Sequence, residues 1–315
     1  MVSVSIIILN WNGKHFLKDC FDSITKQVFK DFEIILVDNG SSDSSIEFVR
    51  ENYPSVKLIE NKKNFGFAEA NNIGARHAKG KYLVFLNNDT VVDKYWLNNL
   101  IGAMKTDKKL GCCGSKLLYH SKKNVINSIG SFLTVFGLSG SLGDGLLSSD
   151  FQEEIYLLAP SGGSMCIRRE LFLRLNGFDP DFFAYSEDLD LGWRVWNSGY
   201  EIKLIPTSEV YHKYKVNRNA KKNYWITRNT MWAIMKNAAW DRIWLLPLSI
   251  LTYLVIGFIF ILTFKLNSGV SIWGGIVDAL VNPRESLVKN NLARKRIIGL
   301  MQSIRIITRK MKKYI

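Results

Sequence analysis

Four short apolar segments, each followed by a polar loop, constrain the fold of this chain more than any other feature. They cover residues 4–9, 33–37, 56–60 and 81–86, and stretches with apolar residues at helical spacing lie between them. Strands that alternate with helices in this way form parallel sheets whose two faces are covered by helices. The first third of the chain therefore predicts an α/β fold.

The middle of the chain is less regular. Residues 120–158 are rich in Gly and Ser without a clear period, so we expect a long loop or lid there. Residues 186–196 predict a helix with Ser186 as its N-cap and acidic residues in its first turn. Short extended segments are expected over residues 200–205 and 210–212.

The last third differs in charge and hydropathy. Residues 221–315 hold 16 basic and 3 acidic residues, so nearly all of the net charge of +14 is concentrated there. Residues 244–264 contain no charged side chain, and a helix of 21 residues is long enough to cross a hydrocarbon core. Residues 272–281 are also largely apolar but are too short to cross.

The flanks of the apolar segment are basic, and a single crossing would place the basic tail from Arg284 on the far side of a membrane. We therefore expect both apolar segments to form a re-entrant or in-plane hairpin on the cytoplasmic face of an anionic membrane. A buried core helix is the alternative. This interpretation divides the chain into a domain of residues 1–218 and a membrane-associated helical region of residues 219–315.

Several function classes lack their sequence signatures. The chain has neither Gly-x-Gly-x-x-Gly after the first strand nor Gly-x-x-x-x-Gly-Lys-Ser/Thr, which argues against dinucleotide oxidoreductases and P-loop NTPases. The Gly-x-Ser-x-Gly elbow of many hydrolases is also missing. The C-terminal basic residues flank apolar segments and match no zinc-finger, RNP or basic-zipper pattern, so we expect no nucleic-acid partner.

Polar side chains follow each predicted strand, in residues 10–11, 38–39, 61–66 and 87–89. The carboxyl ends of parallel strands meet at the same edge of a sheet, where ligands of open α/β folds bind. Asn, Asp and Gly are also ordinary turn formers, so each loop alone has a purely structural interpretation. The four loops together favour a binding site.

These loops carry a resemblance. Residues 7–12 (IILNWN), 37–43 (VDNGSSD), 64–68 (NFGFA), 87–89 (NND) and 186–188 (SED) resemble, in order and spacing, the family 2 inverting glycosyltransferases with a GT-A fold. The resemblance covers roughly residues 3–213 and is greatest to the rhamnosyltransferase-like branch that builds surface polysaccharides. It implies a Rossmann-like, mostly parallel central sheet flanked by helices. It also implies transfer of a sugar from a dTDP- or UDP-sugar to a saccharide hydroxyl, on an acceptor that we expect to be lipid-linked.

The resemblance assigns a nucleotide-binding role to residues of the first loops. These are Asn10, Trp11, Asp38, Asn39, Asn64, Gly66, Asn72 and Asn88. Asp38 would contact the base and ribose, since a carboxylate accepts hydrogen bonds from N–H and O–H groups. The structural alternatives are an Asx-turn for Asp38 and a helix cap for Asn72.

A metal site is implied by residues 87–89, which occupy the position of the family's Asp-x-Asp motif. Mg²⁺ or Mn²⁺ would bridge the phosphates of the sugar donor there. Asp89 would bind this ion together with His212, which lies where many members of the family have a metal-binding His. Asn87 replaces the first Asp and leaves Asp89 as the anionic ligand, which keeps open a non-catalytic binding or scaffold protein as the alternative function. A turn acid and a packing imidazole are the structural alternatives for Asp89 and His212.

The acid pair Glu187-Asp188 resembles the family's catalytic motif. Asp188 would act as the general base on the acceptor hydroxyl, and Glu187 would order the acceptor or the local loop. Asp190 is expected to be a helix-dipole or solvent-exposed acid, and ordinary N-terminal helix acids are the alternative for all three. Gly162 and Gly163 would line the acceptor side. A processive synthase is disfavoured because the chain has a single segment of spanning length and lacks Gln-x-x-Arg-Trp.

Overall fold

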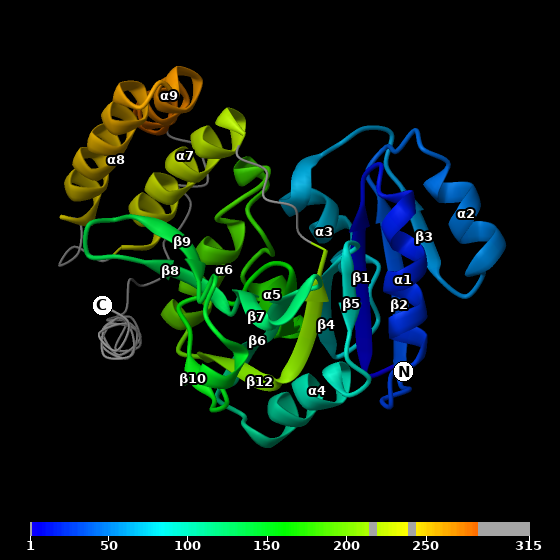
Figure 1. The fold of residues 1–315 in the computed structure, drawn as a ribbon. Coiled ribbons are helices and arrows are strands. Elements are labelled where there is room, and N and C mark those ends of the chain that lie inside the picture. The colour runs from blue at the N-terminus through cyan, green and yellow to red at the C-terminus, as the bar shows by residue number, and fades with distance from the viewer. Residues whose placement is uncertain (1, 214–218, 239–243, 283–315) are drawn as a thin grey trace.

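A mixed sheet of ten strands forms the centre of the computed structural model, which describes residues 2–213, 219–238 and 244–282. Its main path has the order β10-β12-β6-β11-β4-β1-β2-β3, while β5 pairs with β12 and β7 with β6. The N-terminal half is parallel, with β1 between β2 and β4 (Figure 1). Its elements are β1 (Val4–Asn10), α1 (Lys14–Thr25), β2 (Phe32–Asp38), α2 (Ser45–Asn52), β3 (Lys57–Glu60), α3 (Gly66–Arg76) and β4 (Tyr82–Asn87).

The second half of the sheet reverses direction. Strand β11 lies antiparallel between β4 and β6, and β12 then continues parallel to β6. The elements of this half are β5 (Thr90–Val92), α4 (Trp96–Thr106), β6 (Leu110–Tyr119), β11 (Ser164–Arg168), α5 (Arg169–Arg174), the 3₁₀ turn η2 (Pro180–Phe182), α6 (Glu187–Asn197) and β12 (Glu201–His212). The predicted α/β class with a mostly parallel central sheet is confirmed.

The prediction of a long loop over residues 120–158 is wrong. The segment contains β7 (Lys122–Ser128), β8 (Gly130–Leu133), β9 (Ser139–Leu142), the 3₁₀ turn η1 (Ser148–Asp150) and β10 (Ile155–Tyr156). Strands β8, β9 and β10 are too short to show a period, β7 begins with three exposed polar residues, and Gly137 and Gly143 take positive φ angles in the turns that follow β8 and β9. Gly and Ser therefore mark tight turns in this segment.

Residues 201–212 form one long strand, whereas two short segments were expected. The register of β12 against β6 shifts between Ile205 and Glu209. Pro206 lies in this irregular stretch and cannot donate a ladder hydrogen bond, which explains why the sequence pattern breaks there.

Hydrophobic side chains pack on both faces of the sheet. Ile7, Ile35 and Phe85 belong to the cluster on one face, and Ile6 and Leu36 to the cluster on the other. The apolar strands are therefore buried on both faces of the sheet, as their continuous apolar sequences predicted. The carboxyl ends of β1, β2 and β4 consequently remain the free edge that can bind a ligand.

In the described part of the chain after the sheet there are three helices: α7 (Ala220–Asn237), α8 (Leu245–Leu262) and α9 (Leu266–Val281). They lie side by side at the end of the molecule remote from β3 (Figure 1). Helices α8 and α9 form the expected hairpin, but its second helix begins six residues earlier than the predicted start at 272. Among the described residues, α8 is the helix long and apolar enough to cross a membrane, judged by length and composition alone.

The hairpin leaves much of its apolar surface open. Gly257 and Gly269 allow close contact between the two helices, since a Cβ on Gly269 would lie 2.6 Å from the carbonyl oxygen of Gly257. The outer side chains of α8, among them Leu251, Phe258 and Leu262, are exposed. The expected basic tail lies outside the described residues.

Candidate active site

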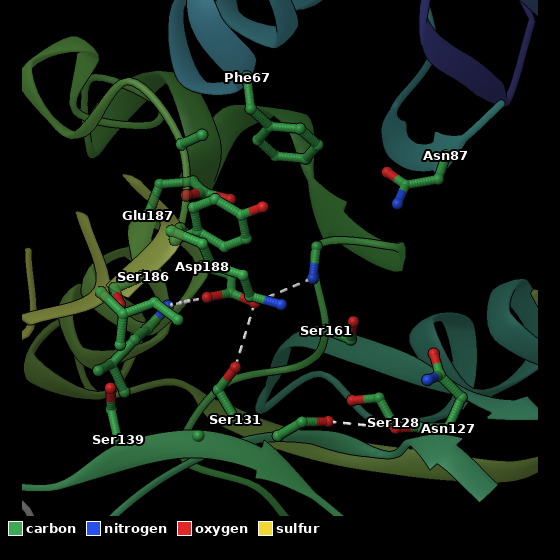
Figure 2. A pocket seen from close by; sticks show the side chains of 18 of the residues that line it. Phe67, Asn87, Asn127, Ser128, Ser131, Ser139, Ser161, Ser186, Glu187 and Asp188 are labelled. Carbon is green, nitrogen blue, oxygen red and sulfur yellow. Dashed lines mark hydrogen bonds between the residues drawn. The ribbon is translucent and has the colours of Figure 1, made fainter. Parts of the chain in front are cut away.

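A cavity of about 490 Å³ lies beside the carboxyl end of β4. It is lined by the end of the sheet, the loop before α6, strands β7–β9 and the start of α7 (Figure 2). Its lining includes Phe67, Asn87, Asp89, Asn127, Ser131, Ser139, Gly162, Tyr185, Glu187, Asp188, His212 and Lys222. The predicted acid pair, the predicted metal ligands and one predicted acceptor-side glycine are thus brought to one pocket.

Asp188 is held in the pocket by three hydrogen bonds. The Gly162 amide and the Ser131 hydroxyl donate to Oδ2 at 3.0 and 3.1 Å, and the Leu189 amide donates to Oδ1 at 2.7 Å (Figure 2). Burial raises the pKa of the Asp188 carboxyl, although these hydrogen bonds oppose the shift. A fixed carboxylate with a raised pKa is a better proton acceptor than a free aspartate.

Glu187 has a different environment. Its side chain is buried, and its Oε2 has no hydrogen-bond partner in the part of the chain that the structure describes. Burial and then the neighbouring Asp188 raise the pKa of Glu187 well above its ordinary value. Hydrogen bonds to the ionised form oppose the shift at Asp188, whereas Glu187 Oε2 receives none, so the surroundings favour the ionised form of Asp188 more than that of Glu187.

The expectation that Asp190 is a helix-dipole or solvent-exposed acid is wrong. Asp190 is fully buried, and its carboxylate accepts from Arg194 at 2.7 Å, Lys236 at 3.1 Å and Asn237 at 2.8 Å. Burial opposes ionisation, but the charges of Arg194 and Lys236 outweigh it and lower the pKa of Asp190 to about 2. Asp190 therefore joins α6 to α7.

Ser186 stands at the N-cap position of α6 but makes no capping hydrogen bond with its side chain, contrary to the prediction. Its φ angle is +63°, and Phe183 and Tyr185 nearby also have positive φ angles of 60° and 70°. Each such non-glycine residue costs on the order of 1–3 kcal/mol and persists only where its surroundings hold it. The loop that carries the acid pair is therefore strained.

Strand pairing brings the two predicted metal ligands together. Because His212 of β12 pairs with Thr90 of β5, Asp89 lies beside His212, with Nε2 and Oδ1 3.1 Å apart. The other ring nitrogen, Nδ1, faces Asn127 Oδ1 at 2.8 Å. In the neutral tautomer with the proton on Nδ1, His212 donates to Asn127 Oδ1, and the lone pair of Nε2 then faces the Asp89 carboxylate, so that a cation could bind between these two acceptors.

The donor set thus fits a divalent ion that receives its remaining ligands from outside the chain. No group of three or more His, Cys, Asp or Glu side chains in the described ranges could hold a metal by itself. Asp89 and His212 offer one oxygen and one nitrogen, and diphosphate oxygens and water would complete the coordination of Mg²⁺ or Mn²⁺.

The residues predicted to bind the nucleotide form a polar network at the edge of the sheet. Asn10 donates to Asp38 Oδ1 at 2.9 Å and accepts from Asn88 at 2.8 Å, because β1 lies in register between β2 and β4. Asn39 donates to Asn64 Oδ1 at 2.9 Å, and Asn64 accepts from the Gly66 amide at 2.8 Å. Trp11 next to this network is 56% exposed.

Two of these residues are buried in structural contacts. The second oxygen of Asp38 accepts from the Ser41 amide at 2.8 Å, which is the turn geometry of the structural alternative. Asn72 is not brought to the pocket, because its amide donates to the Phe178 carbonyl at 2.7 Å and accepts from the Phe178 amide at 2.9 Å. A nucleotide contact of Asp38 or Asn72 stays a prediction.

The two predicted acceptor-side glycines differ. Gly162 lines the cavity, whereas a Cβ on Gly163 would meet the Leu117 side chain at 2.8 Å and its carbonyl accepts from the Asn87 amide. Gly163 therefore packs against β6.

Sequence reasoning missed one wall of the cavity. Asn127, Ser128, Ser131 and Ser139 come from β7–β9, and Lys222 comes from α7. The serine-rich composition of residues 120–158 was the available signal, and composition by itself also fits a loop.

A family model described as glycosyl transferase family 2 matches residues 5–171, more than half of the chain. The chain belongs to this family. A second model, described as the N-terminal domain of galactosyltransferase, matches residues 151–217 of this glycosyltransferase. The predicted family is thereby confirmed.

Two curated relatives cover most of the chain. The O-antigen biosynthesis protein RfbC of Myxococcus xanthus is 28% identical over 71% of this chain and 18% of its own length. An uncharacterized glycosyltransferase of Haemophilus influenzae is 26% identical over 70% of this chain and 71% of its own length. The chain spans less than half the length of two of its curated relatives. It covers 18% of RfbC and 44% of an inactive polypeptide N-acetylgalactosaminyltransferase-like protein 5 of Macaca fascicularis, to which it is 30% identical.

Solved structures share the fold. GalNAc-T7 with UDP, GalNAc and Mn²⁺ has a TM-score of 0.62 at 20% identity, over 75% of this chain and 48% of that one. TarS 1–349 of S. aureus with UDP-GlcNAc has a TM-score of 0.62 at 16% identity, over 99% of this chain and 92% of that one. These neighbours show that this glycosyltransferase has the GT-A fold.

Proposed function

We propose that this family 2 glycosyltransferase moves a sugar from a nucleotide-diphosphate donor to a saccharide hydroxyl with inversion at the anomeric carbon. The observation that carries the proposal is Asp188, a positioned carboxylate with a raised pKa in the same cavity as Asp89 and His212. A general base and a diphosphate site on one pocket are what a single displacement needs.

In this mechanism Asp188 takes the proton of the acceptor hydroxyl, and the hydroxyl oxygen forms a bond to the anomeric carbon. The bond from that carbon to the diphosphate breaks, and its electron pair leaves with the diphosphate. Asp89 and His212 would hold a divalent cation that neutralises charge on the leaving group. Glu187, whose pKa is raised well above its ordinary value, can donate a hydrogen bond to a sugar oxygen in its protonated form.

The donor is proposed to be a UDP- or dTDP-sugar. Neighbouring structures contain UDP with Mn²⁺, GDP-Man with Mn²⁺, and UDP-GlcNAc, so the shared fold accommodates several nucleotides. The polar network around Asn10, Asp38 and Asn64 is the proposed nucleotide side. Because the sequence resembles the rhamnosyltransferase-like branch, the proposal includes a rhamnosyl group as a possible transferred sugar.

We further propose attachment to the cytoplasmic face of an anionic membrane through α8, α9 and the basic residues around them. The exposed face of α8 is apolar, and residues 221–315 are strongly basic. The β8–β9 hairpin connects helix α8 to the pocket, since Ser131 and Ser139 line the pocket and the Gly137 carbonyl accepts from the buried Ser249 of α8. This connection favours a lipid-linked saccharide acceptor in polysaccharide synthesis.

The test is calorimetric binding of UDP, dTDP and GDP to the full chain, with and without Mn²⁺, followed by a transfer assay. We expect tight, metal-dependent binding of one nucleotide and a product whose anomeric configuration is opposite to that of the donor. If no nucleotide binds, the chain is a scaffold that kept the fold, and the transferase proposal is wrong. Binding without Mn²⁺ dependence would contradict only the metal assignment.

A further inference from the structure

The strained loop before α6 needs an external support, because its left-handed residues Phe183, Tyr185 and Ser186 immediately precede the acid pair. The sequence offers no glycine in residues 181–186 that would relax it. Helix α7 packs against α6 and supplies this support from a segment that lies beyond both matching family models.

Asn229 of α7 binds three main-chain carbonyls of this loop with one amide group. Its Nδ2 donates to the carbonyl oxygens of Phe182, Ala184 and Tyr185 at 2.9, 3.0 and 2.7 Å. The side chain is fully buried, so these carbonyls have no access to solvent from that side. A single side chain therefore fixes the backbone on both sides of Phe183.

Arg228 fixes the orientation of that amide. Its Nε donates to Asn229 Oδ1 at 2.9 Å, which turns the NH₂ group of Asn229 toward the loop. Arg228 Nη2 also donates to the Asp181 carbonyl at 3.3 Å, and Nη1 lies 3.4 Å from Asp278 of α9. The support of the loop thus extends from α7 to α9.

The opposite side of the loop is held by the start of helix α3. The Phe183 carbonyl accepts from the Phe67 amide at 2.6 Å and the Ala68 amide at 3.2 Å, at the start of α3. Gly66 is required at this contact, since a Cβ there would lie 2.5 Å from the Phe183 oxygen. The loop is therefore clamped between α3 and Asn229.

We propose that Asn229 is a positioning residue for the transfer reaction, which holds the loop so that Asp188 faces the acceptor hydroxyl. The proposal rests on the proposed function, because it assumes that Asp188 is the base. It adds a residue outside the pocket and outside the family models whose effect reaches the chemistry only through the backbone of residues 182–185.

The experiment compares the full-length Asn229→Ala, Asn229→Asp and Gln27→Ala variants with the wild type. Asn229→Asp keeps the shape of the side chain but loses the NH₂ donor. Gln27 is a matched control: a fully buried amide on the far side of the sheet whose Nε2 donates to the Asp93 carbonyl at 2.7 Å and whose Oε1 accepts from the Leu97 amide at 3.0 Å. Transfer kinetics, nucleotide affinity and melting temperature are measured for each.

We expect both Asn229 variants to lose about 100-fold in kcat, since displacement of a catalytic group by about 1 Å has this effect. Nucleotide affinity should stay within a few-fold of wild type. Gln27→Ala should lose comparable thermal stability but keep its kcat. Equal losses of kcat in Gln27→Ala, or full turnover in Asn229→Asp, would overturn the proposal.

Variants that fail to fold are recognised by their melting curves, and Asn229→Ser, which keeps a shorter hydroxyl donor, then carries the test. We expect the turnover of Asn229→Ser to lie below that of the wild type and of Gln27→Ala, and turnover equal to that of the wild type would contradict the role. If wild-type protein binds nucleotide but transfers no sugar, the proposed function fails independently of Asn229.

Discussion

Asp188 and Glu187 are adjacent acids whose surroundings give them different proton affinities. Asp188 accepts hydrogen bonds from Gly162 and Ser131, whereas Glu187 has an oxygen without a partner among the described residues. Hydrogen bonds to the ionised form favour it, and burial without such bonds disfavours it. The sequence resemblance already implied different roles for the two acids, and their different surroundings supply a physical reason for that difference.

Replacement of the base gives the first prediction. Asp188→Asn should reduce kcat by about 10²–10⁴-fold, because general base catalysis contributes this range and an amide cannot accept the proton. Nucleotide affinity measured by calorimetry should stay near the wild-type value. Asp144→Asn, in which a second pocket carboxylate that accepts from Tyr119 loses its charge, is the control and should retain turnover. Undiminished turnover in Asp188→Asn would remove it as the base.

Loss of the anionic metal ligand gives the second prediction. Asp89→Ala should weaken Mn²⁺-dependent nucleotide binding by more than about 10-fold, since even indirect partners of a metal contribute about 10–100-fold. The measurement is a Mn²⁺ titration at fixed nucleotide concentration. Asp93→Ala changes an acid in the same segment outside the pocket and should leave the titration unchanged. An unaltered response of Asp89→Ala would contradict the site.

At the scale of elements, the parallel half of the fold was predictable and the rest was not. Strands β1, β2 and β4 are apolar runs long enough to show a pattern, and their polar ends predicted the binding edge. Strands β8 and β9 have four residues each and β7 begins with three exposed polar residues, so none shows a continuous apolar run, and contacts such as that of Ser131 with Ala159 join them to more distant segments. A sequence window does not contain such partners.

The same limit applies to Asp190. Its position in the first turn of α6 matches an ordinary helix-dipole acid, because local sequence does not show that Lys236 approaches from α7. The residues of the candidate site that follow strand ends were predictable for the opposite reason, since the parallel register itself places them together.

The contact between α6 and α7 gives the prediction at this scale. Asp190→Ala should lower the free energy of unfolding by about 3–5 kcal/mol, because it leaves Arg194 and part of the Lys236 charge uncompensated in the interior. The measurement is denaturant unfolding at neutral pH. Asp144→Asn, a substitution of an exposed side chain, serves again as the control and should change the free energy of unfolding little.

Acid should have the same effect on the wild type. The pKa of Asp190 is lowered to about 2 in the folded chain and is about 4 in an unfolded one, so its contribution is complete above about pH 4. It is lost as the pH falls from about 4 to about 2. Asp190→Ala should therefore show a weaker acid dependence over this range than the wild type, and an identical profile would contradict the assignment.

At the scale of the whole molecule, the apolar hairpin lies beside α7 and the β8–β9 hairpin (Figure 1), elements that also supply residues to the lining of the pocket. Leu133, Trp193 and Leu245 belong to one hydrophobic cluster, so α8 is packed on the catalytic region. A membrane below α8 would then present its lipids near the β8–β9 hairpin. The division of the chain at 218/219 stays a prediction.

Membrane attachment gives the final prediction. Phe258→Asp combined with Leu262→Asp should reduce binding to vesicles that contain anionic lipids, because two exposed apolar side chains of α8 become charged. Sedimentation with vesicles measures the bound fraction. Leu173→Asp, which makes the same apolar-to-charged change at an exposed leucine on α5, should have no effect. Retained sedimentation of the double variant would contradict attachment through α8.

The hydrogen bonds from α7 to the loop before α6 have a consequence for domain exchange between relatives. The matching family models end at residues 171 and 217, yet Asn229, Lys236 and Asn237 hold the backbone and helix that carry Asp188. A chimaera joined at residue 217 would combine the proposed base of one enzyme with the supporting helix of another. Exchanges that are meant to transfer activity should therefore be joined after residue 238, so that α6 and α7 come from the same parent.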